Sequence, residues 1–250
     1  MNKYFNLIKY LPCLLLASCA TVANQNVSTE TLKPADNLVT EGIPSIRAAI
    51  VADVKAYTEY RPKNFSSWHP SKREMLIAMR ASNSNQIHLL DAPMAKPRQL
   101  TNYAEPVSGA SYQPTQGNFF VFTKDTGGNE VHQFYRGDLA GGKATSLTDE
   151  KLRNEGAVWS NKGDRFIHTA IETDKNRQQA NVITQLRMVN PDDVAQTKSI
   201  TTLPGGGWGS FAWSPDDKQL AMIEYVSINE SHIWLLDLVT GEKNRVTQKT

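Results

Sequence analysis

The sequence predicts an all-β fold: a β-propeller with about four recognisable four-stranded blades, possibly an incomplete larger propeller, preceded by one short amphipathic helix. Three observations support this. A unit of roughly 45 residues recurs four times, each copy holds two strand-like runs, and helical periodicity stops before the first copy. Short strands at this period are typical of propeller blades. Because one such sheet cannot bury both of its faces, we expect the copies to stack side by side around an axis.

The first residues resemble a bacterial lipoprotein leader. A basic start is followed by an apolar run from Leu11 to Leu16 and then by Ala17-Ser18-Cys19. This pattern predicts a signal peptide over residues 1–18 and lipid attachment at Cys19; an ordinary secretory signal cut elsewhere is the alternative. The apolar run is too short for a bilayer, which needs about 20 residues. We therefore expect a lipid-anchored protein on the periplasmic side of the bacterial cell envelope. Ala20 after the cysteine resembles the outer-membrane sorting pattern.

Composition narrows the classes of partner. The chain has two cysteines, Cys13 and Cys19, and both lie in the leader. The mature domain is therefore expected to have no disulfide and to depend on a hydrophobic core. The net charge is +2 and the chain has no basic block. Nucleic acid is consequently not an expected partner, whereas the membrane is one through the lipid anchor.

Two segments precede the repeats. Residues 19–42 are polar and lack periodicity, so we expect a flexible tether. Residues 43–62 form an N-terminal helical segment, because apolar residues recur there at spacings of three and four. We predict one amphipathic helix from Pro44 to Tyr57, with Pro44 at the first helical position and Arg61-Pro62 after its end.

Each repeat begins with an aromatic residue, one other residue, and then Pro or Asn. Pro or Asn ends the strand ladder and starts a turn, and the aromatic at the end of the innermost strand is expected to wedge between blades. The predicted blades cover about 63–104, 105–150, 151–204 and 205–250. The motifs are Trp68-His69-Pro70, Tyr112-Gln113-Pro114, Trp159-Ser160-Asn161 and Trp213-Ser214-Pro215.

Two strand-like runs follow each motif. The first runs are Glu74–Met79, Phe119–Thr123, Arg165–Ala170 and Gln219–Tyr225; the second are Ile87–Asp91, Phe134–Asp138, Leu186–Asn190 and Ile233–Asp237. The copies close on an apolar residue and a threonine: Leu100-Thr101, Leu147-Thr148, Ile200-Thr201 and Val246-Thr247.

Strand alternation divides the loops between two faces. With strands A to D in each blade, the A–B and C–D turns lie on one face, and the B–C and D–A connections lie on the other. We expect short A–B turns and longer, polar B–C and D–A loops, and therefore a working surface on the B–C/D–A face. The candidates for contact with a substrate or partner are Glu130, Glu172, Trp208, Asn229 and Glu230. The alternative is that these are ordinary solvated turn residues.

A search for catalytic chemistry finds little. The string Gly207-Trp208-Gly209-Ser210-Phe211 lacks the second glycine of a Gly-x-Ser-x-Gly elbow and leads into a strand rather than a helix. The five histidines are scattered over different repeats, and none has metal-ligand spacing. No glycine-rich phosphate loop opens a helix. We therefore predict no catalytic residue, no metal site and no cofactor in these residues.

Longer strings resemble the propeller of bacterial prolyl oligopeptidase-type serine peptidases, which include dipeptidyl and acylaminoacyl peptidases. The matching strings are Ser67–Ile77 with Gln86–Leu89, Asp125–Glu130 with Gln133, and Gly206–Asp217 with Glu224–Ser231. The resemblance covers Ile43 to Thr247. It implies a propeller that filters peptides for a C-terminal α/β-hydrolase domain, which holds the catalytic triad and is absent from these 250 residues.

Two interpretations follow from the resemblance. In the first, the chain is the non-catalytic propeller portion of such a peptidase. In the second, it is a stand-alone TolB-like periplasmic lipoprotein that binds a protein or peptide partner. Some relatives hold the substrate amine with an adjacent pair of glutamates. No such pair occurs here, and Glu224 and Glu230 are only loose counterparts.

Overall fold

The computed structural model describes residues 29–173 and 182–248, so the predicted leader and Cys19 lie outside the described residues. The chain divides into two compact units, Met1–Tyr60 and Arg61–Thr250. Among the helices in the described ranges, none combines the length and the apolar character that crossing a membrane requires.

The first unit contains the helix α1 (Ala48–Thr58). The helix itself was predicted correctly, but its predicted start at Pro44 is wrong. The backbone before the helix pairs with an earlier segment, since the Leu32 amide donates a 2.8 Å hydrogen bond to the Ile46 carbonyl. Arg47 is therefore held in an extended conformation (φ −69°, ψ 136°), and helical geometry begins only after it.

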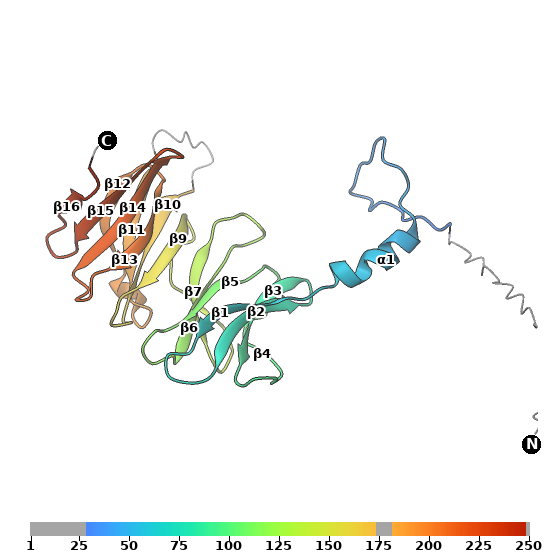
Figure 1. The fold of residues 1–250 in the computed structure, drawn as a ribbon, viewed down its shortest axis with the longest axis horizontal. Helices are drawn as coiled ribbons and strands as arrows, with labels where there is room; N and C mark the ends of the chain where they lie inside the picture. The colour runs from blue at the N-terminus through green and yellow to red at the C-terminus, as the bar shows by residue number, and fades with distance from the viewer. Residues whose placement is uncertain (1–28, 174–181, 249–250) are drawn as a thin grey trace, which may run out of the picture. The chain divides into compact units, whose positions relative to one another are not determined.

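The second unit consists of four four-stranded sheets, each antiparallel with its strands in chain order. This arrangement confirms the predicted all-β propeller class (Figure 1). Blade 1 has β1 (Lys63–Trp68), β2 (Met75–Ala81), β3 (Ser84–Leu90) and β4 (Arg98–Gln99). Blade 2 has β5 (Ser108–Tyr112), β6 (Phe119–Lys124), β7 (Gln133–Asp138) and β8 (Thr145–Ser146). Blade 3 has β9 (Leu152–Trp159), β10 (Phe166–Glu172), β11 (Ile183–Val189) and β12 (Lys198–Pro204), with a short 3-10 helix η2 (Val194–Gln196) before β12. Blade 4 has β13 (Trp208–Trp213), β14 (Gln219–Ser227), β15 (Glu230–Asp237) and β16 (Lys243–Arg245).

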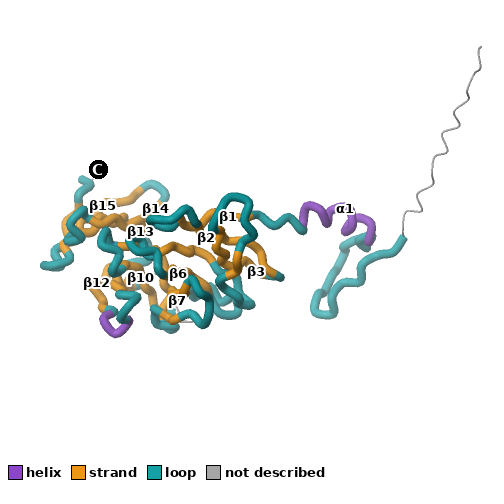
Figure 2. Tube along the Cα trace, turned by 90° about the horizontal axis from the view of Figure 1, so that it is seen from below, coloured by secondary structure: helices purple, strands orange, loops and turns teal. Residues whose placement is uncertain are grey.

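The blades follow one another in an arc, with blade 1 and blade 4 at its two ends (Figures 1 and 2). The first strands of successive blades are neighbours: β1 contacts β5, and β9 contacts β13. The core lies between blades as three apolar layers. Phe120 and Phe122 face blade 1, while Phe119 and Val121 face blade 3. Since a fully buried Phe contributes about 1.5–3 kcal/mol, these layers hold the arc together.

Three of the four repeated aromatic residues, Tyr112, Trp159 and Trp213, occupy the predicted position between blades, whereas Trp68 of blade 1 is exposed. Each is the last residue of the first strand of its blade. The Trp159 ring lies between Phe119 of blade 2 and Phe166 of its own blade, with ring centroids 6.2 and 5.4 Å away. The wedge predicted from the sequence is thus a structural element of the interblade core.

The repeated threonine after the fourth strand fastens that strand to the third. The Thr101 hydroxyl accepts a 2.8 Å hydrogen bond from the Ile87 amide and donates one of 2.9 Å to Gln86 Oε1. Thr148 repeats this arrangement in blade 2, where its hydroxyl donates to Gln133 Oε1. The Gln86 amide in turn donates to the Tyr103 carbonyl of the following D–A connection, and the Gln133 amide donates to the Leu152 carbonyl at the start of β9, so these glutamines link blade 1 to blade 2 and blade 2 to blade 3.

Candidate functional site

The loops of the predicted working face differ in length from blade to blade. The B–C connections 125–132 and 173–182 are long, but those of blades 1 and 4 are only 82–83 and 228–229. The expectation of longer B–C loops is therefore wrong for these two blades. The reason is strand register: β2–β3 pairing continues to Ala81 opposite Ser84, and β14–β15 pairing continues to Ser227 opposite Glu230. These two blades carry tight hairpins where loops were expected.

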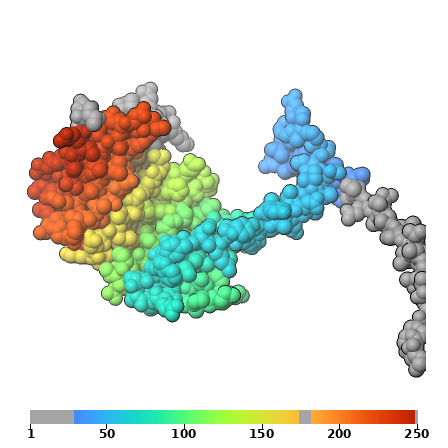
Figure 3. Space-filling model, viewed as in Figure 1, coloured from blue at the N-terminus to red at the C-terminus, as the bar shows by residue number. Residues whose placement is uncertain are grey.

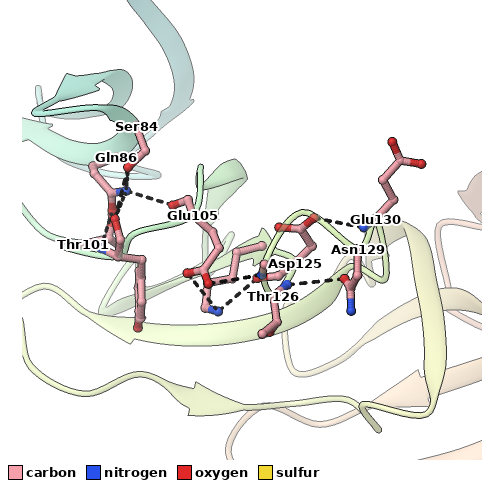
Figure 4. Close-up of polar contacts among 11 residues, drawn as sticks. Ser84, Gln86, Thr101, Glu105, Asp125, Thr126, Asn129 and Glu130 are labelled. Carbon is pink, nitrogen blue, oxygen red and sulfur yellow. Dashed lines mark hydrogen bonds and ion pairs between the residues drawn. The ribbon is translucent and has the colours of Figure 1, made fainter. Parts of the chain in front are cut away.

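Glu130 lies at the end of a turn that is built from its own polar residues (Figure 4). The Glu130 amide donates a 3.0 Å hydrogen bond to Asp125 Oδ2, and Asn129 Oδ1 accepts one of 2.9 Å from the Val131 amide. Glu130 has a φ of 59°, and its side chain points away from the other labelled residues. The turn therefore presents this carboxylate to solvent on the B–C/D–A face.

Next to this turn, the nearly buried side chain of Lys124 lies close to one carboxylate and two aromatic rings. Lys124 Nζ lies 3.9 Å from Glu105 Oε2 and 5.1 Å from the ring centroids of both Tyr103 and Tyr135. Glu105 Oε1 also accepts a 3.3 Å hydrogen bond from the Gly127 amide. The pKa of Glu105 is lowered by hydrogen bonds from its own amide and that of Gly127, and then by Lys124. Through these contacts, Glu105 links the D–A connection between blades 1 and 2 to the B–C turn of blade 2.

The other exposed candidates lie on the same face but on different blades. Glu172 is the last residue of β10, and the Asn229 amide donates to Ser227 Oγ at 3.3 Å in the blade 4 hairpin. Glu230 begins β15, where its Oε1 lies 2.8 Å from His232 Nε2. These side chains therefore share a face without forming one cluster.

Trp208 is a buried residue rather than a surface loop residue. It begins β13, its ring packs 6.0 Å from that of Trp234, and its Nε1 donates a 2.7 Å hydrogen bond to the Pro204 carbonyl. Lys243 Nζ lies 5.2 Å from the Trp208 ring centroid. Trp208 nevertheless lines a cavity of about 610 Å³ between blades 3 and 4.

That cavity, here called cavity A, combines charged, apolar and backbone groups. It is lined by Arg153 and Ile171 of blade 3, by Glu224 and Tyr225 of blade 4, and by Val182, Pro204–Trp208 and Val226. Glu224 Oε2 accepts a 2.8 Å hydrogen bond from Trp234 Nε1, which orients the carboxylate.

Glycine at position 207 is required by the wall of cavity A. The Tyr225 amide donates a 2.8 Å hydrogen bond to the Gly207 carbonyl. A Cβ at residue 207 would lie 1.9 Å from the Tyr225 carbonyl oxygen. Part of the glycine-rich string seen in the sequence therefore serves close backbone approach.

A second cavity, cavity B, lies between blades 2 and 3 and measures about 430 Å³. Its lining includes Ser108 and Thr123, whose hydroxyls are 3.1 Å apart, together with His132, Asn154 and Glu155. Asn154 Nδ2 donates to the His132 carbonyl at 3.1 Å, while its buried Oδ1 has no hydrogen-bond partner within the described part of the chain.

Strand β9 lies between the two cavities and contributes lining residues to both. It contributes Arg153 to cavity A and Glu155 to cavity B, and the Arg153 Nε to Glu155 Oε1 distance is 3.3 Å. The lining residues come from the starts of first strands and the ends of second strands. Both cavities therefore lie at the B–C/D–A end of their blades.

Sequence reasoning missed the residues of β9. One available signal was charge, because β9 carries Arg153 and Glu155, while β5 and β13 carry no charged residue. Within residues 29–173 and 182–248, no group of three or more His, Cys, Asp or Glu side chains is placed so that it could hold a metal ion.

Comparison with known proteins supports the fold. No model of a known protein family and no curated protein sequence matches the chain. An oligogalacturonate lyase in complex with manganese has a TM-score of 0.62 and 14% identity, over 76% of this chain and 54% of that one. An oligogalacturonate lyase from Vibrio parahaemolyticus gives 0.59 and 14% over the same shares. A structure from a study of two prolyl endopeptidases gives 0.51 and 10%, over 74% of this chain and 26% of that one.

The chain thus spans about half the length of the two lyases. These likenesses show the β-propeller fold, and at such low sequence identity they show the fold alone.

Proposed function

We propose that this chain is a peptide-binding propeller that does no chemistry itself: the substrate-filtering portion of a prolyl oligopeptidase-family serine peptidase. The observation that carries this proposal is the pair of cavities on either side of β9. They lie on one face, and the Arg153–Glu155 ion pair connects them.

The chemistry of the cavities suits an extended peptide. A peptide offers backbone donors and acceptors, apolar side chains and charged ends, and binding sites typically combine apolar walls with a few polar groups. Cavity A has apolar walls at Ile171 and Val182, a guanidinium at Arg153 and an oriented carboxylate at Glu224. Cavity B adds the hydroxyls of Ser108 and Thr123. The loop candidates Glu130, Glu172, Asn229 and Glu230 would border the path of the peptide.

The remaining parts of the proposal rest on sequence resemblance. An α/β-hydrolase domain would supply the catalytic triad, and lipid on Cys19 would hold the protein at the periplasmic side of the outer membrane. In the alternative form, the same face binds a protein or peptide partner of a stand-alone TolB-like lipoprotein. Both forms need recognition of a polypeptide, either a peptide or a protein partner, on the B–C/D–A face.

Peptide titration tests the proposal. Fluorescence anisotropy of labelled, proline-containing peptides should show saturable binding to the full chain in detergent. Arg153→Ala should weaken that binding about tenfold, the effect of losing one charge-assisted hydrogen bond.

The matched control is Lys162→Ala, which removes an equal charge from an A–B turn on the opposite face. Equal affinity in the wild type, Arg153→Ala and Lys162→Ala proteins would contradict the proposed site. Absence of binding to any peptide would contradict the proposed function.

A further inference from the structure

Cavity B, between blades 2 and 3, lies at two interruptions of strand pairing. The pairing of β5 with β6 shifts register after Ser108, and the pairing of β9 with β10 shifts register after Glu155. Each bulge contains a glycine with positive φ, 60° at Gly109 and 69° at Gly156, and both glycines line cavity B. β-Bulges are over-represented beside active sites, because they redirect the side chains next to them. The two bulges therefore shape the lining of this cavity.

The two hydroxyl groups in the lining of cavity B have no proton left for a ligand. Thr123 Oγ1 lies 3.1 Å from the Ser108 carbonyl oxygen and 3.1 Å from Ser108 Oγ. Since a carbonyl can only accept, the Thr123 hydroxyl donates to it, and the Ser108 hydroxyl donates to Thr123 Oγ1. Ser108 Oγ therefore offers a ligand its lone pairs, and acts as an acceptor.

The Asn154 amide is held with its oxygen unpaired. Its Nδ2 donates towards the carbonyl oxygens of Leu152 at 2.7 Å and His132 at 3.1 Å, and towards Gln133 Oε1 at 2.9 Å. Because these neighbours are acceptors, they fix which end of the amide faces them. Asn154 is 1% exposed, and its Oδ1 has no hydrogen-bond partner within the described part of the chain. A buried acceptor without a donor is unfavourable, and a ligand donor that reaches it would satisfy it.

Glu155 adds a negative charge to cavity B. Its Oε1 lies 3.3 Å from Arg153 Nε, whereas its Oε2 has no ion-pair or hydrogen-bond partner among the described residues. The buried ring of Phe134 and the methyl group of Ala157 supply apolar contacts, and the His132 ring completes the lining. Cavity B thus combines apolar walls with oxygen acceptors, one of which is charged.

We propose that cavity B binds the guanidinium group of an arginine side chain in the peptide, a proposal that rests on the proposed peptide binding. A guanidinium has five N–H donors and no acceptor, so it matches a lining that offers mainly acceptors. Its planar fork can bind more than one oxygen at once: Glu155 Oε2 on one edge, and Asn154 Oδ1 or Ser108 Oγ on another. The volume of about 430 Å³ leaves room for one long side chain, whose stem would pack against Phe134.

Two related side chains distinguish charge from shape. Lysine carries the same charge on a compact ammonium, which lacks the planar fork of arginine. Citrulline has the shape of arginine but is uncharged and carries a carbonyl in place of one nitrogen. A site of charged and neutral acceptors should therefore prefer arginine to lysine, and lysine to citrulline.

Peptide titration of the full chain in detergent tests this order. Each proline-containing peptide carries a neutral fluorescent label at its N-terminus and an amide at its C-terminus, so that the tested residue supplies its only charge. Arginine, lysine, citrulline or alanine is placed at each position in turn. At one position, the arginine peptide should bind about tenfold more tightly than the citrulline peptide, the effect of a charge-assisted over a neutral hydrogen bond.

Glu155→Gln should abolish the difference in affinity between the arginine and citrulline peptides. Glu242→Gln is the matched control, because it removes an equal charge from the C–D turn of blade 4 on the opposite face; it should keep the tenfold preference. Circular dichroism checks that both variants are folded. If Glu155 served only to hold Arg153, Glu155→Gln would weaken both peptides equally and keep their ratio, and the assignment would be overturned.

The remaining outcomes separate this site from the proposed function. Saturable binding with equal affinity for arginine and citrulline peptides at every position would overturn the guanidinium site and leave peptide binding standing. Tighter binding of lysine than of arginine would also overturn it. If no peptide binds at all, the proposed function is contradicted, and the guanidinium site with it.

Discussion

At the scale of single residues, His168 is the most unusual group of the core. It is fully buried between the rings of Phe134 and Phe166, with its Nδ1 3.0 Å from the Thr169 carbonyl. Its Nε2 has no hydrogen-bond partner among the described residues. Burial lowers the pKa of His168 to about 4. The ring is therefore neutral in the folded protein at pH 7, and Nδ1 donates to the carbonyl.

This pKa predicts acid sensitivity. An unfolded histidine has a pKa of about 6.5, so between pH 6.5 and 4 the unfolded chain binds more protons than the folded one. The free energy of unfolding should therefore decrease as the pH is lowered from 6.5 to 4, and His168 should account for roughly 3 kcal/mol of that decrease. His168→Met should remove that part of the loss, since Met222 fills the equivalent position of blade 4. Urea unfolding at pH 7.5 and pH 4.5 measures it, with the partly buried His232→Gln as the control. The same pH dependence in wild type and His168→Met would contradict the assignment.

At the scale of elements, most of the blade was predictable. The strands and the interblade aromatics follow from local pattern, because alternation, turns and the aromatic motif recur in every copy. Three features were not predictable. The start of α1 depends on pairing with residues 30–32, which lie far from the helical pattern. The tight hairpins of blades 1 and 4 depend on how far strand register extends. Trp208 looked like a loop residue because three glycines precede it.

The close approach of Gly207 to Tyr225, where β13 and β14 of blade 4 begin to pair, gives a prediction at this scale. Gly207→Ala places a methyl group 1.9 Å from the Tyr225 carbonyl oxygen, so the strands must move apart. We expect a loss of roughly 1–3 kcal/mol in the free energy of unfolding, typical of overpacking. Gly209→Ala is the matched control, because nothing lies within 4 Å of its Cβ position. Chemical denaturation distinguishes the two, and equal stability of both variants would show that the wall of cavity A tolerates a side chain.

At the scale of the whole molecule, the second unit is an arc of four blades that follow one another in chain order (Figure 3). Its core lies between blades rather than within them. Cavity B lies between blades 2 and 3, and cavity A lies between blades 3 and 4. The sequence could indicate the face that bears these cavities, because strand alternation fixes which loops share an end. It could not indicate Arg153 and Glu155, since residues within a strand acquire a role at the site only when the neighbouring blades are in place.

The most direct test of peptide binding on this face is hydrogen–deuterium exchange of the full chain with and without a saturating proline-containing peptide. Binding at cavities A and B predicts slower exchange in residues 153–156, 205–208 and 224–226, with no change in the A–B turns 69–74, 113–118 and 160–165 on the opposite face. Protection confined to those A–B turns, or no protection in either set, would contradict the proposed peptide-binding face.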